Sequence, residues 1–82
     1  MSDKLTEMKL TILSLLSKWK ERWGTAPTGP GIALSLGWRR EDATTTLCAL
    51  LKDGLVGRPG KWGNAWRWDI TTAGRQALKE HK

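Results

Sequence analysis

The chain has 82 residues and a net charge of +6, and this length predicts a single domain over residues 1–82. One cysteine excludes a disulfide framework, and the apolar runs are too short for a membrane span. The first residues lack the pattern of a signal peptide, which predicts a cytoplasmic protein without a membrane partner.

The first predicted element is an amphipathic helix over residues 5–23. Apolar side chains recur at steps of three and four residues and form one stripe: Leu5, Met8, Ile12, Leu15, Leu16, Trp19 and Trp23. Gly24 is well placed to end this helix. Because Trp19 and Trp23 lie on the stripe, we predict that they are buried in the core, together with Trp38.

Residues 25–31 are predicted to break the chain, because they hold two prolines and two glycines. A short second helix is predicted over residues 32–36 and ends at Gly37. A third helix follows over residues 40–52, with its acids in the first turn, where the helix dipole favours them. Its apolar face comprises Ala43, Leu47, Leu50 and Leu51. Residues 44–46 are threonines, which are poor helix formers, so some of them are expected to face outward.

Two strands of a hairpin are predicted over residues 55–59 and 65–70. In the second, Trp66, Trp68 and Ile70 alternate with polar residues, so they share one face and the two tryptophans are expected in the core. Residues 60–64 are predicted to form a flexible basic loop. Trp62 at its tip either contacts a partner or folds back onto Trp66. A final short helix is predicted over residues 73–80, capped by Thr71 or Thr72.

Three helices, two strands and a last helix, with a glycine turn after the second helix, are the order of a helix-turn-helix unit. Residues 31–37, 43–56 and 70–75 resemble the winged helix-turn-helix superfamily, and most of all the MarR-type and PadR-type bacterial regulators. These segments are similar to the second helix and turn, to the recognition helix running into the first strand, and to the segment that closes the wing. The resemblance implies a mainly α fold with a small β-hairpin, in which a three-helix core carries a two-stranded wing and a short C-terminal helix.

The resemblance also implies a function and a set of contacts. It implies a sequence-specific protein that binds double-stranded DNA, namely a small transcriptional regulator of bacterial or phage type. The net charge of +6 favours the same polyanionic partner. By this resemblance the third helix would face the major groove with Arg39, Arg40, Thr44 and Thr45. The wing would approach phosphates or the minor groove with Arg58, Lys61, Trp62, Asn64 and Arg67.

Other partners are left open by the sequence. A homodimer would form through the helix over residues 5–23, because the last helix is shorter than the dimerisation helices of these families. Trp62 and the wing could instead dock on a protein, and the acids Glu41 and Asp42 on the third helix favour this alternative. RNA binding through basic residues and exposed aromatic rings is a weaker third reading.

Catalysis and metal binding are not predicted. The sequence has no nucleophile elbow, no phosphate-binding loop and no recognisable pair of catalytic carboxylates, so it is not expected to be an enzyme. Cys48 and His81 are too few to hold zinc, and no cofactor is predicted. Cys48 is expected to be inert and His81 to be a solvated residue of the tail.

Overall fold

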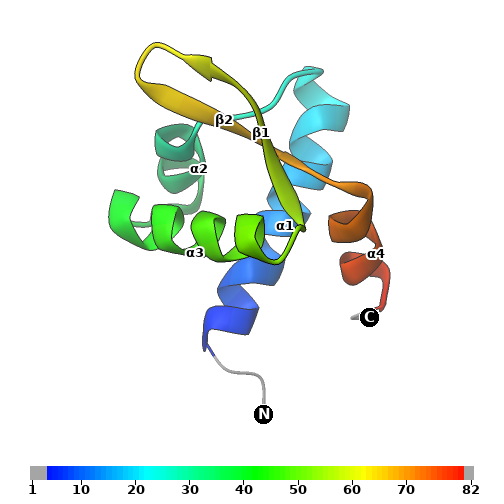
Figure 1. Ribbon diagram of the computed structural model, residues 1–82. Coiled ribbons are helices and arrows are strands. Elements are labelled where there is room, and N and C mark those ends of the chain that lie inside the picture. The colour runs from blue at the N-terminus through cyan, green and yellow to red at the C-terminus, as the bar shows by residue number, and fades with distance from the viewer. Residues whose placement is uncertain (1–3, 81–82) are drawn as a thin grey trace.

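The computed structural model describes residues 4–80, and His81 lies outside them. The predicted order of elements is confirmed: α1 (Lys4–Trp23), α2 (Gly29–Leu36), α3 (Arg40–Lys52), β1 (Val56–Trp62), β2 (Ala65–Ile70) and α4 (Thr72–Glu80). Figure 1 shows α2 and α3 on one side of the long helix α1, α4 on the other side, and the hairpin reaching out beyond α2. The mainly α fold with a small hairpin is therefore as predicted.

The core lies where α1, α2, α3 and the base of the hairpin meet. Each element contributes apolar side chains to it, and the buried cluster is Ile12, Leu13, Leu16, Ile32, Leu47, Leu50, Val56, Trp68 and Ile70. Full burial of such a side chain stabilises the fold by about 1.5–3 kcal/mol. The middle of the predicted stripe of α1 thus packs inward, with Ile12 and Leu16 buried and Leu15 against the core, whereas the side chain of Leu5 lies outside the described residues. No helix within residues 4–80 is long and apolar enough to cross a membrane.

Several tryptophans are less buried than their spacing predicts. Trp23 is the last residue of α1 and is 62% exposed, with its ring centroid 6.3 Å from that of Trp19. Trp19 and Trp38 are half-buried, and Trp38 packs against the core. Trp66 shares the face of Trp68 but is 38% exposed. The core ends at Trp68 because the hairpin runs beyond the helices from there on.

The second helix begins three residues earlier than predicted, at Gly29. Thr28 is extended, with φ −87° and ψ 164°, and its Oγ1 accepts a hydrogen bond from the backbone N–H of Gly31 at 3.3 Å. Pro30 lies in the first turn, where its missing N–H has no intrahelical partner to lose. The left-handed Gly37, with φ 69°, ends the helix as predicted. Residues 29–31 are therefore a capped helix start and not part of the break.

Replacing Thr28 by alanine is expected to lower the free energy of unfolding by about 1 kcal/mol, because the cap of α2 is lost. Urea unfolding followed by far-ultraviolet circular dichroism measures this change. Thr28→Ser keeps the hydroxyl and is expected to restore most of the stability. Equal midpoints for the alanine and serine variants would contradict the assigned cap.

The hairpin is longer and tighter than predicted. Residues 60–62 belong to β1, and only Gly63 and Asn64 form the turn, with Gly63 at φ 64°. A loop over residues 60–64 is therefore wrong for three of its five positions. Gly57 pairs with Asp69 and Gly60 with Arg67, so two residues of β1 bulge opposite Trp68 alone. Those two are Arg58 and Pro59, and a bulge on an edge strand accommodates a proline without losing a ladder hydrogen bond.

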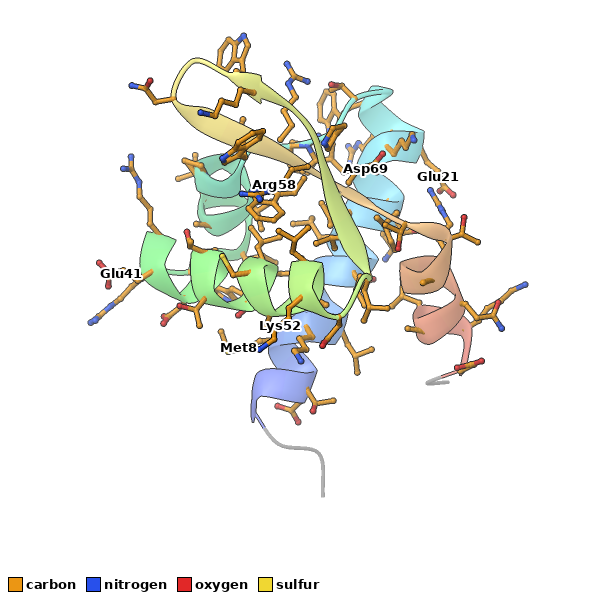
Figure 2. All side chains as sticks on the ribbon, in the orientation of Figure 1. Met8, Glu21, Glu41, Lys52, Arg58 and Asp69 are labelled. Atoms are coloured by element: carbon orange, nitrogen blue, oxygen red, sulfur yellow. The ribbon has the colours of Figure 1, made fainter. Side chains whose placement is uncertain are left out.

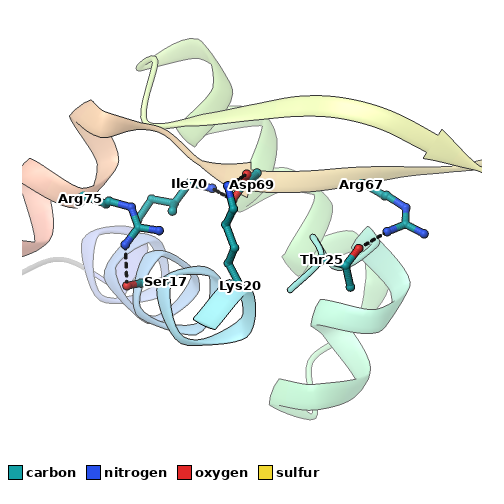
Figure 3. A network of polar contacts seen from close by, with 7 residues as sticks. All are labelled: Ser17, Lys20, Thr25, Arg67, Asp69, Ile70 and Arg75. Carbon is teal, nitrogen blue, oxygen red and sulfur yellow. Dashed lines mark hydrogen bonds and ion pairs between the residues drawn. The ribbon is translucent and has the colours of Figure 1, made fainter. Parts of the chain in front are cut away.

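The segment before α2 fastens the hairpin to the body. Thr28 forms an isolated bridge with Arg67, and the backbone N–H of Trp68 donates to the carbonyl of Pro27 at 2.8 Å. On the next stretch of β2, Asp69 forms an ion pair with Lys20 of α1 at 3.0 Å (Figure 3). These contacts fix the direction in which the hairpin leaves the helices.

Candidate nucleic-acid interface

The outward face of α3 consists of short side chains. Thr44, Thr45 and Cys48 are exposed, whereas Thr46 is fully buried and its hydroxyl donates to the carbonyl of Asp42 at 2.8 Å. The buried face of the helix holds Ala43, Leu47 and Leu50, as its periodicity predicts. Two of the three threonines therefore face outward, and the helix backbone is open to close approach from that side.

Charged side chains surround this short-chain face of α3. Arg39 precedes the helix without a side-chain cap, and Arg39, Arg40 and Lys52 are all exposed. Glu41 and Asp42 are also exposed in the first turn, and Figure 2 shows Glu41 projecting from the beginning of the helix. Cations therefore stand at both ends of the face, with two acids among them at the first turn.

The acidic residue that follows α3 forms an ion pair with α1. Asp53 is the residue at the C-terminal cap of α3, and its carboxylate pairs with Nζ of Lys9 on α1 at 3.0 Å. Asp69 on β2 is paired with α1 in the same way. Asp53 and Asp69 are thus partly neutralised by cations of α1, whereas Glu41 and Asp42 remain as exposed acids on α3.

The face of the hairpin that continues the core carries two cations on one tryptophan ring. Cζ of Arg58 and Nζ of Lys61 each lie 4.7 Å from the ring centroid of Trp66, and Cζ of Arg58 is also 5.7 Å from that of Trp68. Figure 2 shows Arg58 on the side of the hairpin that faces α3. Cation–π attraction holds both side chains, while their like charges repel. An anion bound between them would relieve that repulsion. We call Arg58, Lys61 and Trp66 the cationic face of the hairpin.

The opposite face of the hairpin carries Trp62. Because Lys61 pairs with Trp66 and Trp62 with Ala65, the pleat places Trp62 on the far side from Trp66. Folding back onto Trp66, one of the two readings of the sequence, is therefore wrong, and Trp62 is 69% exposed. Asn64 is exposed beside it in the turn.

Arg67 lies apart from the other predicted wing contacts. It shares the face of Trp62, and its Nη1 donates to Oγ1 of Thr25 and to the carbonyl of Ala26, the latter at 3.4 Å (Figure 3). The structure therefore brings Arg58 and Lys61 together and holds Arg67 against the segment that leads into α2.

For Trp66, the spacing along the sequence predicts the wrong environment. Alternation along β2 places it with Trp68 and predicts burial, but it serves as the platform for both cations. The dipeptide Gly63-Asn64 could have revealed this, because such pairs favour two-residue hairpin turns. A two-residue turn sets Lys61 directly opposite Trp66.

The chemistry available at this surface is that of charge, hydrogen bonds and stacking. Cys48 is an exposed free thiol on α3. Within residues 4–80, no three side chains of the His, Cys, Asp or Glu type gather closely enough to hold a metal ion. The side chains of α3 and the hairpin present guanidinium, ammonium, hydroxyl and indole groups, which are suited to contacts with phosphates and base edges.

Neither models of known protein families nor curated proteins match the sequence, whereas solved structures match the fold. A variant of ZitR from Lactococcus lactis superposes with a TM-score of 0.77 at 26% identity, over 99% of this chain and 53% of the other. A second ZitR structure, named a zinc-responsive MarR family member, gives 0.73 at 23% identity, over 99% and 54%. The adhesin competence repressor AdcR of Streptococcus pyogenes gives 0.77 at 21% identity, over 95% and 54%.

The matches cover nearly the whole chain, which spans about half the length of each of these three structures. A match over 99% of this chain takes in residues of every helix and of both strands. The chain therefore has the winged-helix fold of the MarR-family transcriptional regulators.

Proposed function

We propose that the chain binds double-stranded DNA sequence-specifically as a small transcriptional regulator, with α3 in the major groove and the hairpin along the backbone. The observation that carries this proposal is the pairing of two surfaces on one side of the molecule. Arg58, in the cationic face of the hairpin, lies on the side that faces α3, whose exposed side chains Thr44 and Thr45 are short (Figure 2). We assign the protein a cytoplasmic location and no catalytic activity.

The composition of α3 supports its insertion into the groove. The major groove is about 12 Å wide and admits a helix, and short outward side chains allow the helix backbone to come near the base edges. The hydroxyls and methyl groups of Thr44 and Thr45 suit phosphates and thymine methyls. Arg39 and Arg40 at the start of the helix have the reach and donors for guanine edges or phosphates.

The hairpin supplies the contacts to the backbone. Arg58 and Lys61 both lie against the ring of Trp66, and this contact reduces the side-chain freedom that they lose on binding phosphates. Trp62 and Asn64 at the tip reach the minor groove, where an exposed ring wedges against a base step. The hydrogen bond from Arg67 to Thr25 fastens the hairpin to the segment before α2. Arg67 also adds positive charge to the outer face of the hairpin.

Titration of a labelled mixed-sequence duplex at two salt concentrations, followed by fluorescence anisotropy, tests the proposal. The two phosphate contacts of Arg58 and Lys61 predict that affinity falls about tenfold between about 50 mM and 200 mM salt, and each further contact steepens the fall. A single-stranded RNA of equal length serves as the competitor control and is expected to bind more weakly. Failure to bind the duplex at low salt would overturn the assignment in favour of a protein-docking module.

Two alanine variants separate the backbone contacts from the base contacts. Lys61→Ala is expected to weaken binding about eightfold for every duplex, which is the loss of one phosphate contact at about 0.1 M salt. Arg40→Ala is expected to reduce the preference for a selected site by about 1–3 kcal/mol, because a base contact discriminates by that amount. Anisotropy titrations against a selected and a random duplex measure both effects. Unchanged selectivity in the Arg40 variant would contradict the placement of α3.

A further inference from the structure

A groove with an apolar floor runs along α1, bordered by α4 over its first part and by the end of α2, on residues that the DNA-binding proposal does not use. Leucines from three helices form its floor, namely Leu10 and Leu15 of α1, Leu36 of α2 and Leu78 of α4. A second hollow, lined by Trp19 and Trp23, continues it along α1 and shares Leu15 and Lys18 with the first. From Leu10 to Trp23 the two hollows follow α1 for about 20 Å, given the rise of a helix.

The rim of this groove is entirely basic. Its charged lining residues are Lys18, Arg22, Arg75 and Lys79, and no acid is among the residues that line either hollow. Two of the four contact neighbouring side chains. Nη1 of Arg75 lies 3.4 Å from Oγ of Ser17 on α1 (Figure 3), and Cζ of Arg22 is 5.6 Å from the ring centroid of Trp23. The nearest acid on α4 is Glu80, which accepts a hydrogen bond at 3.3 Å from Gln76, a residue that lines the groove.

The charge pattern argues against a second copy as the occupant. In a two-fold symmetric contact the same surface meets itself, so four cations of one copy would face four of the other. Like charges set against each other in this way cost several kcal/mol. In addition, Ile12, Leu13 and Leu16 are buried in the protein's own core, so they cannot contribute apolar area to a dimer through residues 5–23.

We propose that this groove docks an amphipathic helix of a partner protein, one with an apolar stripe flanked by aspartate and glutamate. The groove has the length of a helix of about four turns, and its apolar side chains along α1 suit a partner helix with apolar residues spaced as i, i+3, i+4 and i+7. Its basic rim pairs with acidic flanks and repels basic ones. Such a partner can bind this groove at the same time as α3 and the hairpin bind DNA, because the two surfaces share no residues.

A synthetic helical peptide tests the proposal. The probe is a fluorescein-labelled leucine–glutamate helix, and the control is the same peptide with lysine in place of glutamate, both at physiological salt. We expect saturable binding of the acidic peptide alone. The double variant Arg75→Glu/Lys79→Glu is expected to weaken it about tenfold or more, as loss of rim charges slows association and weakens the complex. Trp23→Ala, at an exposed position where folding is not at risk, is expected to weaken it as well.

The matched control is the double variant Arg40→Glu/Lys52→Glu, which changes net charge by the same amount on the face of α3. It is expected to leave peptide binding within about twofold. Equal loss in both double variants, or equal binding of the basic peptide, would overturn the proposal. A dimer in sedimentation that Trp23→Ala abolishes would also overturn it, and so would stronger binding to phosphatidylglycerol vesicles than to the peptide. Duplex binding by the Trp23 variant, measured in parallel, separates a failure here from a failure of the DNA-binding proposal.

Discussion

The double variant Arg58→Glu/Lys61→Glu is expected to lose about 100-fold or more of its affinity for mixed-sequence duplex DNA at about 0.1 M salt. Loss of two phosphate contacts alone accounts for about 60-fold at that salt, and the two introduced carboxylates add repulsion. Both side chains lie 4.7 Å from the ring of Trp66, so the change falls on one compact cluster. Anisotropy titration measures the effect, and circular dichroism confirms that the variant is folded.

The control for this variant is Lys18→Glu/Lys79→Glu, which makes the same change in net charge on the surface between α1 and α4. Both double variants fall from a net charge of +6 by the same four charges. If position matters, the control is expected to lose far less duplex affinity than the hairpin variant. Equal loss in both would show that overall charge and not the cationic face of the hairpin governs binding.

Gly74→Ala is expected to lower the free energy of unfolding by about 3 kcal/mol and the melting temperature by about 12 °C or more. Alanine usually stabilises a helix relative to glycine by about 1 kcal/mol, so the expected sign is reversed here. Gly74 is buried in α4, and a Cβ there would clash with the carbonyl oxygen of Leu55 and come within 2.7 Å of Cγ1 of Ile70. The collision with backbone cannot be relieved by a rotamer change, so α4 has to move.

A second glycine provides the matched control for this prediction. Gly57 lies in β1 with no atom within 4 Å of the Cβ that alanine would add, and its φ is not positive. Gly57→Ala is therefore expected to change stability by less than about 1 kcal/mol. Thermal unfolding of both variants by circular dichroism gives the comparison. A Gly74→Ala protein as stable as the original would show that α4 does not pack closely on Leu55 and Ile70.

The helices could be predicted from the sequence because the apolar periodicity and the residues that end helices indicate the same bounds. The third helix runs from Arg40 to Lys52 as predicted, since its apolar face repeats regularly and Gly54 follows it. The start of α2 was missed because Pro30 and the flanking glycines resemble a break. Thr28 followed by a proline in the first turn is instead a favourable helix start.

The parts of the interface that could not be predicted depend on contacts between distant segments. Trp66 has the spacing of a core residue, and only the place where the hairpin leaves the body decides that it is exposed. Arg67 was grouped with the other wing cations because its bonds to Thr25 and Ala26 require the segment before α2 to cross β2. The close packing of Gly74 likewise depends on Leu55, nineteen positions earlier in the chain. Local patterns of residues contain no information on such crossings.

We propose that α3 and the cationic face of the hairpin together form one surface for duplex DNA. Nuclear magnetic resonance titration of the isotope-labelled protein with a short duplex tests it most directly, residue by residue. We expect the amide signals of Arg40, Thr44 and Thr45 to shift together with those of Arg58 and Lys61. The signals of Ser17 and Arg75, between α1 and α4, are expected to stay in place. Shifts confined to the groove along α1, or shifts along the hairpin with none in α3, would contradict it.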